Sequence, residues 1–262
     1  MPFDPDTVQE GALELPGGPT LAYSLHFPTA TSRSNLRQAA LIAHPYGRLG
    51  GSRHDHVVVA LARMLVEEGW LVCRYDARGA GNSTGSGSWT GAPEAEDYQR
   101  ILHNVLLPLL SPSSASSAAA SVESAPPTIY DLLLCGYSFG SLAASSCPAP
   151  PPTSAASFRT RYLLVSYPLS VLWALCSFRS STFTTALRTT IQKGEHRTLA
   201  IFGDGDQFSS VGKFRRWSDE LGKEAGSTEC WQAVEVEGAD HFWGDRAKKR
   251  ELLEAVREWL RT

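Results

Sequence analysis

Short apolar runs alternate with segments of helical periodicity along most of this chain. Two short runs near the start, 12–15 and 20–27, flank Pro-Gly-Gly-Pro and predict an antiparallel hairpin. The later apolar runs, typical of strands in a sheet that is buried on both faces, lie at 39–44, 70–76, 130–136, 161–167, 197–203 and 230–238. Helical patterns cover 56–69, 92–110, 139–147, about 210–223 and about 246–260. This alternation predicts an α/β protein with a mostly parallel central sheet, helices on both faces and an antiparallel hairpin at one edge.

Two segments interrupt this alternation. Residues 111–127 consist mostly of Ser, Ala and Pro, and residues 148–157 are rich in Pro, so both segments predict loops. No internal repeat is visible. Because 262 residues is the length of one large α/β domain, we interpret 1–262 as a single domain with two low-complexity loops.

Composition narrows the class of protein. Hydrophobic residues make up 42% and charged residues 19% of the chain, which is an ordinary globular balance. The net charge of −3 argues against a nucleic-acid partner. The first ten residues lack the basic start and apolar run of a secretory signal, and polar residues interrupt the most apolar window, 162–178. Five scattered cysteines show no disulfide or metal spacing. We therefore expect a cytoplasmic protein with no membrane span.

One pentapeptide introduces candidate chemistry. Gly136-Tyr137-Ser138-Phe139-Gly140 fits the pattern G-x-S-x-G and joins an apolar run to a helical segment. Glycines at these positions allow a sharp turn that exposes the serine as a nucleophile. The alternative is an ordinary strand–helix junction in which Ser138 only caps the helix. The pentapeptide alone does not decide between these interpretations.

A serine nucleophile needs an imidazole to accept its proton and a carboxylate to orient that imidazole. His241 follows the last apolar run, where a base could reach Ser138, although a loop histidine with local hydrogen bonds is the alternative. Asp206 follows the run 197–203 and is the favoured acid, with Asp204 and Asp240 as weaker candidates. The chain order is then Ser138, Asp206, His241, which is the order of the nucleophile-elbow enzymes.

With these motifs together, the sequence strongly resembles the α/β-hydrolase superfamily. The segments that carry the resemblance are 43–52, 76–83, 136–140, 203–208 and 238–243. More narrowly, His-Pro followed by Gly-Gly-Ser, with D-x-R-G-x-G-x-S downstream, is similar to compact hydrolases related to dienelactone hydrolases and serine aminopeptidases. The resemblance implies the α/β-hydrolase fold, with Ser138 as nucleophile, His241 as base and Asp206 as the orienting acid. Segment 168–196 is too short for a large lid, so we expect a minimal cap over the site, with residues 171–178 as its candidate roof.

The resemblance also implies an oxyanion hole made by the backbone N–H groups of Phe139 and Tyr46. His44, in the same loop as Tyr46, is interpreted as a structural residue whose ring holds that loop. Tyr46, Trp173 and Phe178 are candidates to line an apolar acyl pocket.

Two motifs suggest other chemistry but are better explained structurally. The glycines at 79–85 resemble a dinucleotide fingerprint, but they follow a mid-chain strand and open no helix. We therefore expect a turn, braced by a pair between Asp76 and Arg78. His54-Asp55-His56 suggests a metal site, but without a second ligand pair we interpret it as a polar helix start with Asp55 near the helix dipole. We expect no metal and no cofactor.

These patterns predict a serine hydrolase that cleaves a carboxylic ester or thioester, and possibly an amide, through an acyl-enzyme. The expected partner is a small-molecule acyl substrate. The alternative is a non-hydrolytic biosynthetic or binding protein on the same fold. Peptidase specificity is less favoured, because nothing in the sequence indicates a site for a substrate terminus.

Overall fold

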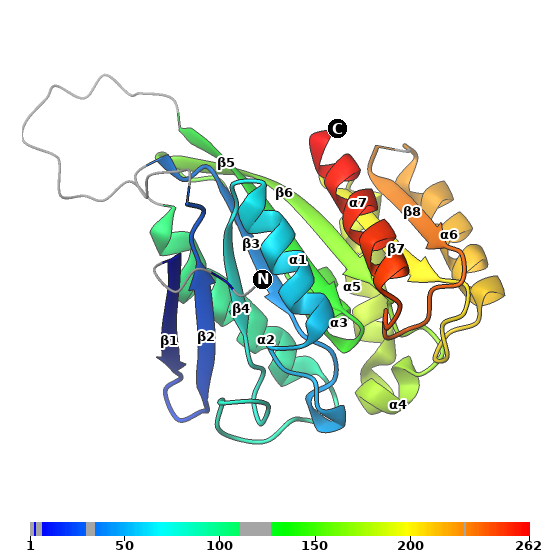
Figure 1. Cartoon of the computed structure of the whole chain (residues 1–262), viewed down its shortest axis with the longest axis horizontal. Helices are drawn as coiled ribbons and strands as arrows, with labels where there is room; N and C mark the ends of the chain where they lie inside the picture. Colours follow the sequence, from blue (N-terminus) through cyan, green and yellow to red (C-terminus); the bar gives the residue numbers. More distant parts are fainter. Residues whose placement is uncertain (1–2, 4–6, 30–34, 111–126, 228) are drawn as a thin grey trace, which may run out of the picture.

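The central feature of the computed structural model is an eight-stranded sheet of order β1-β2-β4-β3-β5-β6-β7-β8 (Figure 1). The structure describes residues 3, 7–29, 35–110, 127–227 and 229–262, without the side chain of Phe178. The strands are β1 (Val8–Glu14), β2 (Thr20–His26), β3 (Gln38–Ala43), β4 (Leu71–Tyr75), β5 (Thr128–Tyr137), β6 (Ala156–Val165), β7 (Arg197–Gly203) and β8 (Trp231–Val236). Strands β3 to β8 run parallel to one another, and β1 and β2 form an antiparallel edge. The sheet and hairpin predicted from the sequence are confirmed.

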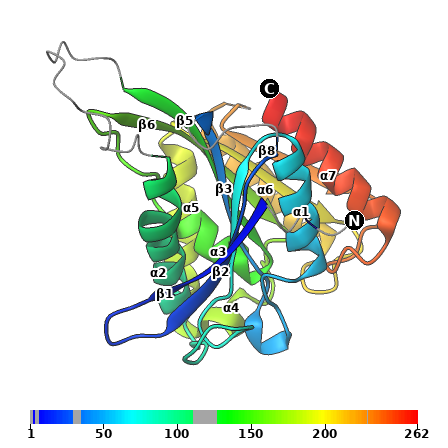
Figure 2. The same ribbon diagram turned by 60° about the vertical axis from the view of Figure 1, so that its left-hand side comes forward.

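Helices cover both faces of the sheet (Figure 2). They are α1 (His56–Glu67), α2 (Ala92–Ile101), α3 (Phe139–Ser146), α4 (Leu172–Cys176), α5 (Ser180–Gln192), α6 (Val211–Ala225) and α7 (Arg246–Arg261). Helices α1 and α7 bury Leu61, Val256 and their neighbours against one face. Helices α2, α3, α5 and α6 bury Tyr98, Leu142, Phe183 and Phe214 against the other. The apolar stripe of each helix therefore packs against one face of the sheet and forms a helical layer there.

Several predicted boundaries are wrong, among them the start of β1, which lies at Val8 and not at 12. Strand β6 begins at Ala156 rather than at 161, because it pairs with β5 from Thr128 onward, so the irregular part of the predicted loop 148–157 ends before Ala156. The helix predicted over 92–110 ends as α2 at Ile101 and continues as a π-helical turn (Leu102–Leu106) and a 3-10 turn (Leu107–Leu109). Pro108 accounts for this change, because its ring lacks an N–H and clashes with the preceding turn of a regular helix.

The other predicted loop, 111–127, lies outside the described residues except for residue 127. Among the residues that the structure describes, no helix is long and apolar enough to cross a membrane.

The carboxyl ends of the parallel strands bring distant parts of the sequence to one edge of the sheet. Ala43 at the end of β3 pairs with Gly136 in β5, and Gly203 at the end of β7 pairs with Val236 in β8. The loop after β3 and helix α4 lie side by side at this edge in both views (Figures 1 and 2). Helix α5 packs against the core through Phe183, so α4 is the part of segment 168–196 that approaches the candidate site.

Candidate active site

The turn between β5 and α3 places Ser138 in a backbone conformation that non-glycine residues rarely adopt, with φ of 53° and ψ of −120°. The flanking glycines are required by close contacts. A Cβ atom at Gly136 would lie 2.1 Å from the carbonyl oxygen of Gly140, and one at Gly140 would lie 2.5 Å from that of Ala43. The pattern G-x-S-x-G therefore allows α3 to start directly against the ends of β3 and β5, with Ser138 at the tip of the turn.

The Ser138 side chain contacts a histidine instead of the helix. Its Oγ makes no capping bond to α3 and lies 2.9 Å from Nε2 of His241. The interpretation of Ser138 as a helix cap is therefore wrong. A backbone hydrogen bond of 2.8 Å from Ser138 N to Val165 O ties the turn to β6.

His241 lies in the loop between β8 and α7 and is held on several sides. Nδ1 of its ring lies 2.6 Å from Oδ2 of Asp206. Its backbone N–H donates to the side-chain oxygen of Gln207 at 3.0 Å, and its carbonyl accepts from the Tyr137 hydroxyl at 2.9 Å. The Phe208 ring packs against the imidazole in a T-shaped arrangement, with centroids 4.6 Å apart. The ring is 3% exposed, so it has little freedom to leave this position.

Asp206 is oriented by its own turn after β7. Its Oδ1 accepts from the backbone N–H groups of Phe208 at 2.8 Å and Ser209 at 2.9 Å, which leaves Oδ2 for His241. An ionised carboxylate only accepts hydrogen bonds. Nδ1 of His241 therefore carries the proton and donates to Asp206, and Nε2 is left to accept from the Ser138 hydroxyl.

The two competing aspartates have other partners. Asp204 Oδ1 accepts from Gly238 N at 2.6 Å, and Asp240 Oδ1 accepts from Gly244 N at 3.2 Å. Both carboxylates thus stabilise the backbone of the loop after β8. Asp206 is the aspartate that reaches the His241 ring.

Of the two residues expected to donate to the oxyanion, Phe139 follows Ser138 in the sequence and Tyr46 lines the same cavity as Ser138. Tyr46 and Phe139 pack together with ring centroids 5.0 Å apart, and the hydrogen bonds of the described residues include none donated by either backbone N–H. His44 supports the loop that carries Tyr46. Its Nδ1 contacts Pro45 O at 2.5 Å, and its Nε2 accepts from Ala77 N at 2.9 Å. Burial lowers the pKa of His44, which favours the neutral ring that this pair of contacts requires.

A cavity of about 150 Å³ opens next to the serine. Its lining is mostly apolar and consists of Pro45, Tyr46, Leu49, Gly50, Gly51, Asp55, Tyr137, Ser138, Val171, Leu175, Phe208, His241 and Phe242. Tyr46 is among these residues, as expected. The side chain of Phe178, the other aromatic candidate near α4, lies outside the described residues.

The prediction that Trp173 lines the pocket is wrong, because this side chain is 72% exposed and does not border the cavity. Val171 and Leu175, four positions apart around α4, share the face that borders the cavity, and Trp173 lies on another face. Phe208 and Phe242 were not predicted, although each lies within two residues of a candidate catalytic residue in the sequence.

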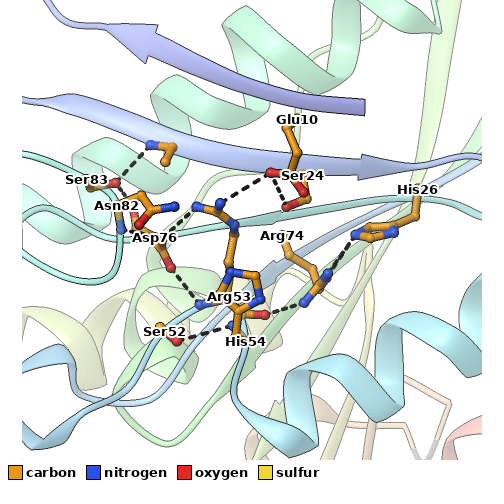
Figure 3. A network of polar contacts seen from close by, with 11 residues as sticks. Glu10, Ser24, His26, Ser52, Arg53, His54, Arg74, Asp76, Asn82 and Ser83 are labelled. Atoms are coloured by element: carbon orange, nitrogen blue, oxygen red, sulfur yellow. Dashed lines mark hydrogen bonds and ion pairs between the residues drawn. The ribbon is translucent and has the colours of Figure 1, made fainter. Parts of the chain in front are cut away.

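A second correction concerns the turn after β4. Asp76 does not pair with Arg78. It accepts from the backbone N of Arg53 at 2.7 Å and from the Arg53 guanidinium at 2.6 Å (Figure 3). Arg78 pairs instead with Asp97 through two 2.7 Å bonds. The turn wraps around the Asp76 carboxylate so closely that a Cβ atom at Gly81 would lie 2.2 Å from Oδ2. The Asp76 carboxylate thus lies between the turn after β4 and the loop that carries Arg53.

The polar helix start at His54-Asp55-His56 is present as predicted. Asp55 is the N-cap of α1, and its side chain accepts from Val57 N and Val58 N. Among the described residues, no three His, Cys, Asp or Glu side chains converge as metal ligands would.

Comparison with solved structures finds several similar folds, whereas no protein-family model and no curated protein matches the sequence. A serine hydrolase homologue from Coxiella burnetii is 21% identical, with a TM-score of 0.67 over 95% of this chain and 96% of that one. XC6422 from Xanthomonas campestris, described as an α/β serine hydrolase without a lid, is 20% identical, with a TM-score of 0.66 over 100% and 97%. Est1E from Butyrivibrio proteoclasticus, solved with ferulic acid, is 15% identical, with a TM-score of 0.62 over 93% and 95%. At these identities the likeness establishes a shared fold, and the predicted α/β-hydrolase fold is confirmed.

Proposed function

We propose that this chain, which has the α/β-hydrolase fold, is a serine hydrolase that cleaves carboxylic esters or thioesters through an acyl-enzyme. The observation that carries the proposal is the continuous chain of contacts from Ser138 Oγ to His241 Nε2, 2.9 Å, and from His241 Nδ1 to Asp206 Oδ2, 2.6 Å. These three side chains come from three separate loops, and a structural role for Ser138 would not need this alignment.

In the proposed acylation step, Ser138 Oγ attacks the substrate carbonyl carbon and its proton passes to Nε2 of His241. Asp206 holds the opposite ring nitrogen and stabilises the imidazolium that forms. The carbonyl oxygen becomes an oxyanion beside the N–H groups of Phe139 and Tyr46, and one such donor contributes about 3 kcal/mol to transition-state stabilisation. When the intermediate collapses, the Nε2 proton passes to the leaving oxygen or sulfur, and an ester of Ser138 remains.

Deacylation uses the same groups in the reverse order. Water attacks the acyl carbon, Nε2 of His241 accepts a proton from that water, and the carboxylic acid leaves as the proton returns to Ser138 Oγ. The atoms and protons balance with water as the only co-reactant. No cofactor is required.

The cavity supports a short, apolar acyl group as substrate. Its volume is about 150 Å³, and the side chains of Leu49, Leu175, Phe208 and Phe242 supply apolar walls. The similar fold of the esterase Pf2001 from Pyrococcus furiosus is consistent with this proposal. A thioester presents the same carbonyl geometry, and an amide requires stronger leaving-group protonation by His241.

Labelling with a fluorophosphonate tests the proposal directly. We expect the wild-type protein to be labelled at Ser138 and to hydrolyse p-nitrophenyl esters of short acids, and we expect Ser138→Ala to lose both properties. Ser146→Ala is the matched control, because Ser146 lies on the same helix and its hydroxyl bonds the helix backbone at 2.7 Å. The proposal fails if folded wild-type protein resists the label or if Ser138→Ala retains hydrolysis.

A further inference from the structure

The cavity beside Ser138 contains one carboxylate that the proposed reaction does not use. Asp55 precedes helix α1 and lines the same cavity as Ser138 and His241. Its side chain is half-buried, so water and substrate can reach it.

Among the residues that the structure describes, only one oxygen of this carboxylate accepts hydrogen bonds. Oδ1 accepts from Val57 N at 2.8 Å and from Val58 N at 3.5 Å. The hydrogen bonds of the described residues include none to Oδ2. Capping the helix therefore leaves Asp55 with an acceptor oxygen and a negative charge available in the cavity.

Among the described residues that line the cavity, no Lys or Arg side chain neutralises this charge. The Arg53 guanidinium, two positions away, pairs with Asp76 and Glu10, and Lys249 contacts the exposed His56 at 2.9 Å. Burial raises the pKa of Tyr137, and the carboxylates of Asp55, Asp240 and Asp206 raise it further, which is consistent with a negative potential at this wall.

The segment that presents Asp55 is firmly held (Figure 3). The backbone N of Arg53 donates to Asp76 at 2.7 Å, and its carbonyl accepts from the guanidinium of Arg74. Asp55 N donates to Ser52 O at 2.9 Å. A charge on so constrained a backbone is positioned before substrate arrives, so little ordering is needed on binding.

We propose that Asp55 selects substrates by charge, so that the enzyme prefers esters that carry a cationic group, such as a quaternary ammonium, close to the scissile bond. This inference rests on the proposed hydrolase function and names the substrate class for that site. The preference is modest, because a half-exposed charge is screened by water and salt.

The experiment compares substrate pairs of equal shape and different charge. One pair varies the leaving group and consists of the cation butyrylcholine and its neutral analogue 3,3-dimethylbutyl butyrate. The other pair varies the acyl group, as the p-nitrophenyl esters of 4-(trimethylammonio)butanoic acid and 5,5-dimethylhexanoic acid. For wild-type protein we expect kcat/KM for the cation to exceed that for its neutral partner by about twofold to fivefold in at least one pair, as charge pairs of this exposure give.

Asp55→Asn isolates the charge, because asparagine retains an oxygen that caps helices as well as aspartate does. We expect the cation-to-neutral ratio in this variant to fall toward one, and Asp55→Ser, which also keeps a cap, to behave in the same way. Asp245→Asn is the matched control, since Asp245 caps α7 in the same manner and does not line the cavity. Increasing the salt concentration should reduce the ratio for wild-type protein.

Two outcomes overturn this inference without affecting the proposed function. One is Ser138-dependent hydrolysis with equal rates for cation and neutral partner in both pairs. The other is a cation preference that is the same in wild type, Asp55→Asn and Asp55→Ser. Absence of any Ser138-dependent hydrolysis would instead overturn the proposed function itself.

Discussion

The hydroxyl of Tyr137 donates to the backbone carbonyl of His241 at 2.9 Å. Tyr137 is the last residue of β5 and immediately precedes Ser138, so this bond joins the loop of the candidate base to the strand that carries the candidate nucleophile. The bond is buried and separate from the contact between Ser138 and His241. The relative position of the two loops therefore does not depend on the contact between Ser138 and His241 alone.

Removing this hydroxyl should loosen the site without unfolding the protein. In Tyr137→Phe the ring still fills the core, but the His241 carbonyl loses its donor, and we expect a loss of about 1–3 kcal/mol in the free energy of unfolding. We also expect kcat on a short p-nitrophenyl ester to fall while KM changes little. Urea unfolding and steady-state kinetics measure the two effects, and unchanged kcat would contradict the positioning role.

Two neighbouring aspartates provide a matched test of the candidate acid. Asp206→Asn keeps the shape of the side chain but removes the charge that holds the His241 tautomer, so we expect kcat to fall by about 10³- to 10⁴-fold. Asp204→Asn retains an oxygen that can accept from Gly238 N, and we expect it to keep most of the activity. Equal losses in the two variants would argue against Asp206 as the orienting acid.

Gly140 should tolerate no side chain. The Cβ atom of Gly140→Ala would lie 2.5 Å from Ala43 O, so α3 or the end of β3 must move, and we expect both lower stability and loss of hydrolysis. Gly222→Ala is the control, since its Cβ meets Trp231 at an ordinary 3.6 Å and alanine is favoured over glycine inside a helix by about 0.5–1 kcal/mol. Thermal melting should shift down for the first variant and up for the second.

The buried pair of Arg53 and Asp76 should matter more for stability than an exposed pair. Arg53→Met removes the guanidinium from a carboxylate that is fully buried, and breaking a buried pair in this way costs about 3–5 kcal/mol. Arg215→Met, which breaks the exposed pair with Glu235, should leave the melting temperature almost unchanged. Comparable shifts of the melting temperature in the two variants would show that burial does not strengthen the pair of Arg53 and Asp76.

Stability should also depend on His26. Burial, together with the charge of Arg74 and the nearby His54, lowers the pKa of His26 to about 3. An unfolded chain binds this proton near pH 6.5, so between about pH 6.5 and pH 3 the unfolded state carries a proton that the folded state lacks. The contribution of the neutral His26 ring to the free energy of unfolding is therefore present above pH 6.5 and is lost as the pH falls toward 3.

Denaturant unfolding at several values between pH 7 and pH 5 measures this effect before most carboxylates titrate. We expect the free energy of unfolding to decrease toward pH 5, with a smaller slope in His26→Gln, whose amide oxygen can still accept from Arg74. His103→Gln, at an exposed position, is the control and should keep the wild-type slope. A slope that is the same in wild type and His26→Gln would contradict the prediction.

The sequence predicted the sheet well where the strands are buried on both faces, because continuous apolar runs mark such strands. The sequence was less successful at the ends of strands that carry polar residues. Strand β1 begins at Val8, before the first apolar run, because Gln9 and Glu10 in its first half are polar and exposed. Strand β6 includes Ser157 and Arg159 near its start, and pairing with β5 extends it beyond what side-chain hydrophobicity indicates.

At the candidate site, the sequence identified the three side chains that lie together, because motif order and strand ends restrict where Ser138, Asp206 and His241 can be. It indicated residues 171–178 as the roof of the site but selected Trp173 instead of Val171 and Leu175, because one turn of helix decides which residue faces inward. It did not indicate the partner of Asp76, since Arg53 is brought to it by the path of a loop. Contacts of this kind depend on tertiary geometry that no local pattern encodes.

Helix α4 has a consequence for how this protein could acquire new substrates. Its five residues form no part of the sheet, and Leu175 within it and Val171 at its N-cap line the cavity. Exchange of these two side chains would reshape the space for an acyl group while the strands and the reacting groups stay in place. Adaptation to a different acid could therefore proceed through small steps that leave folding intact.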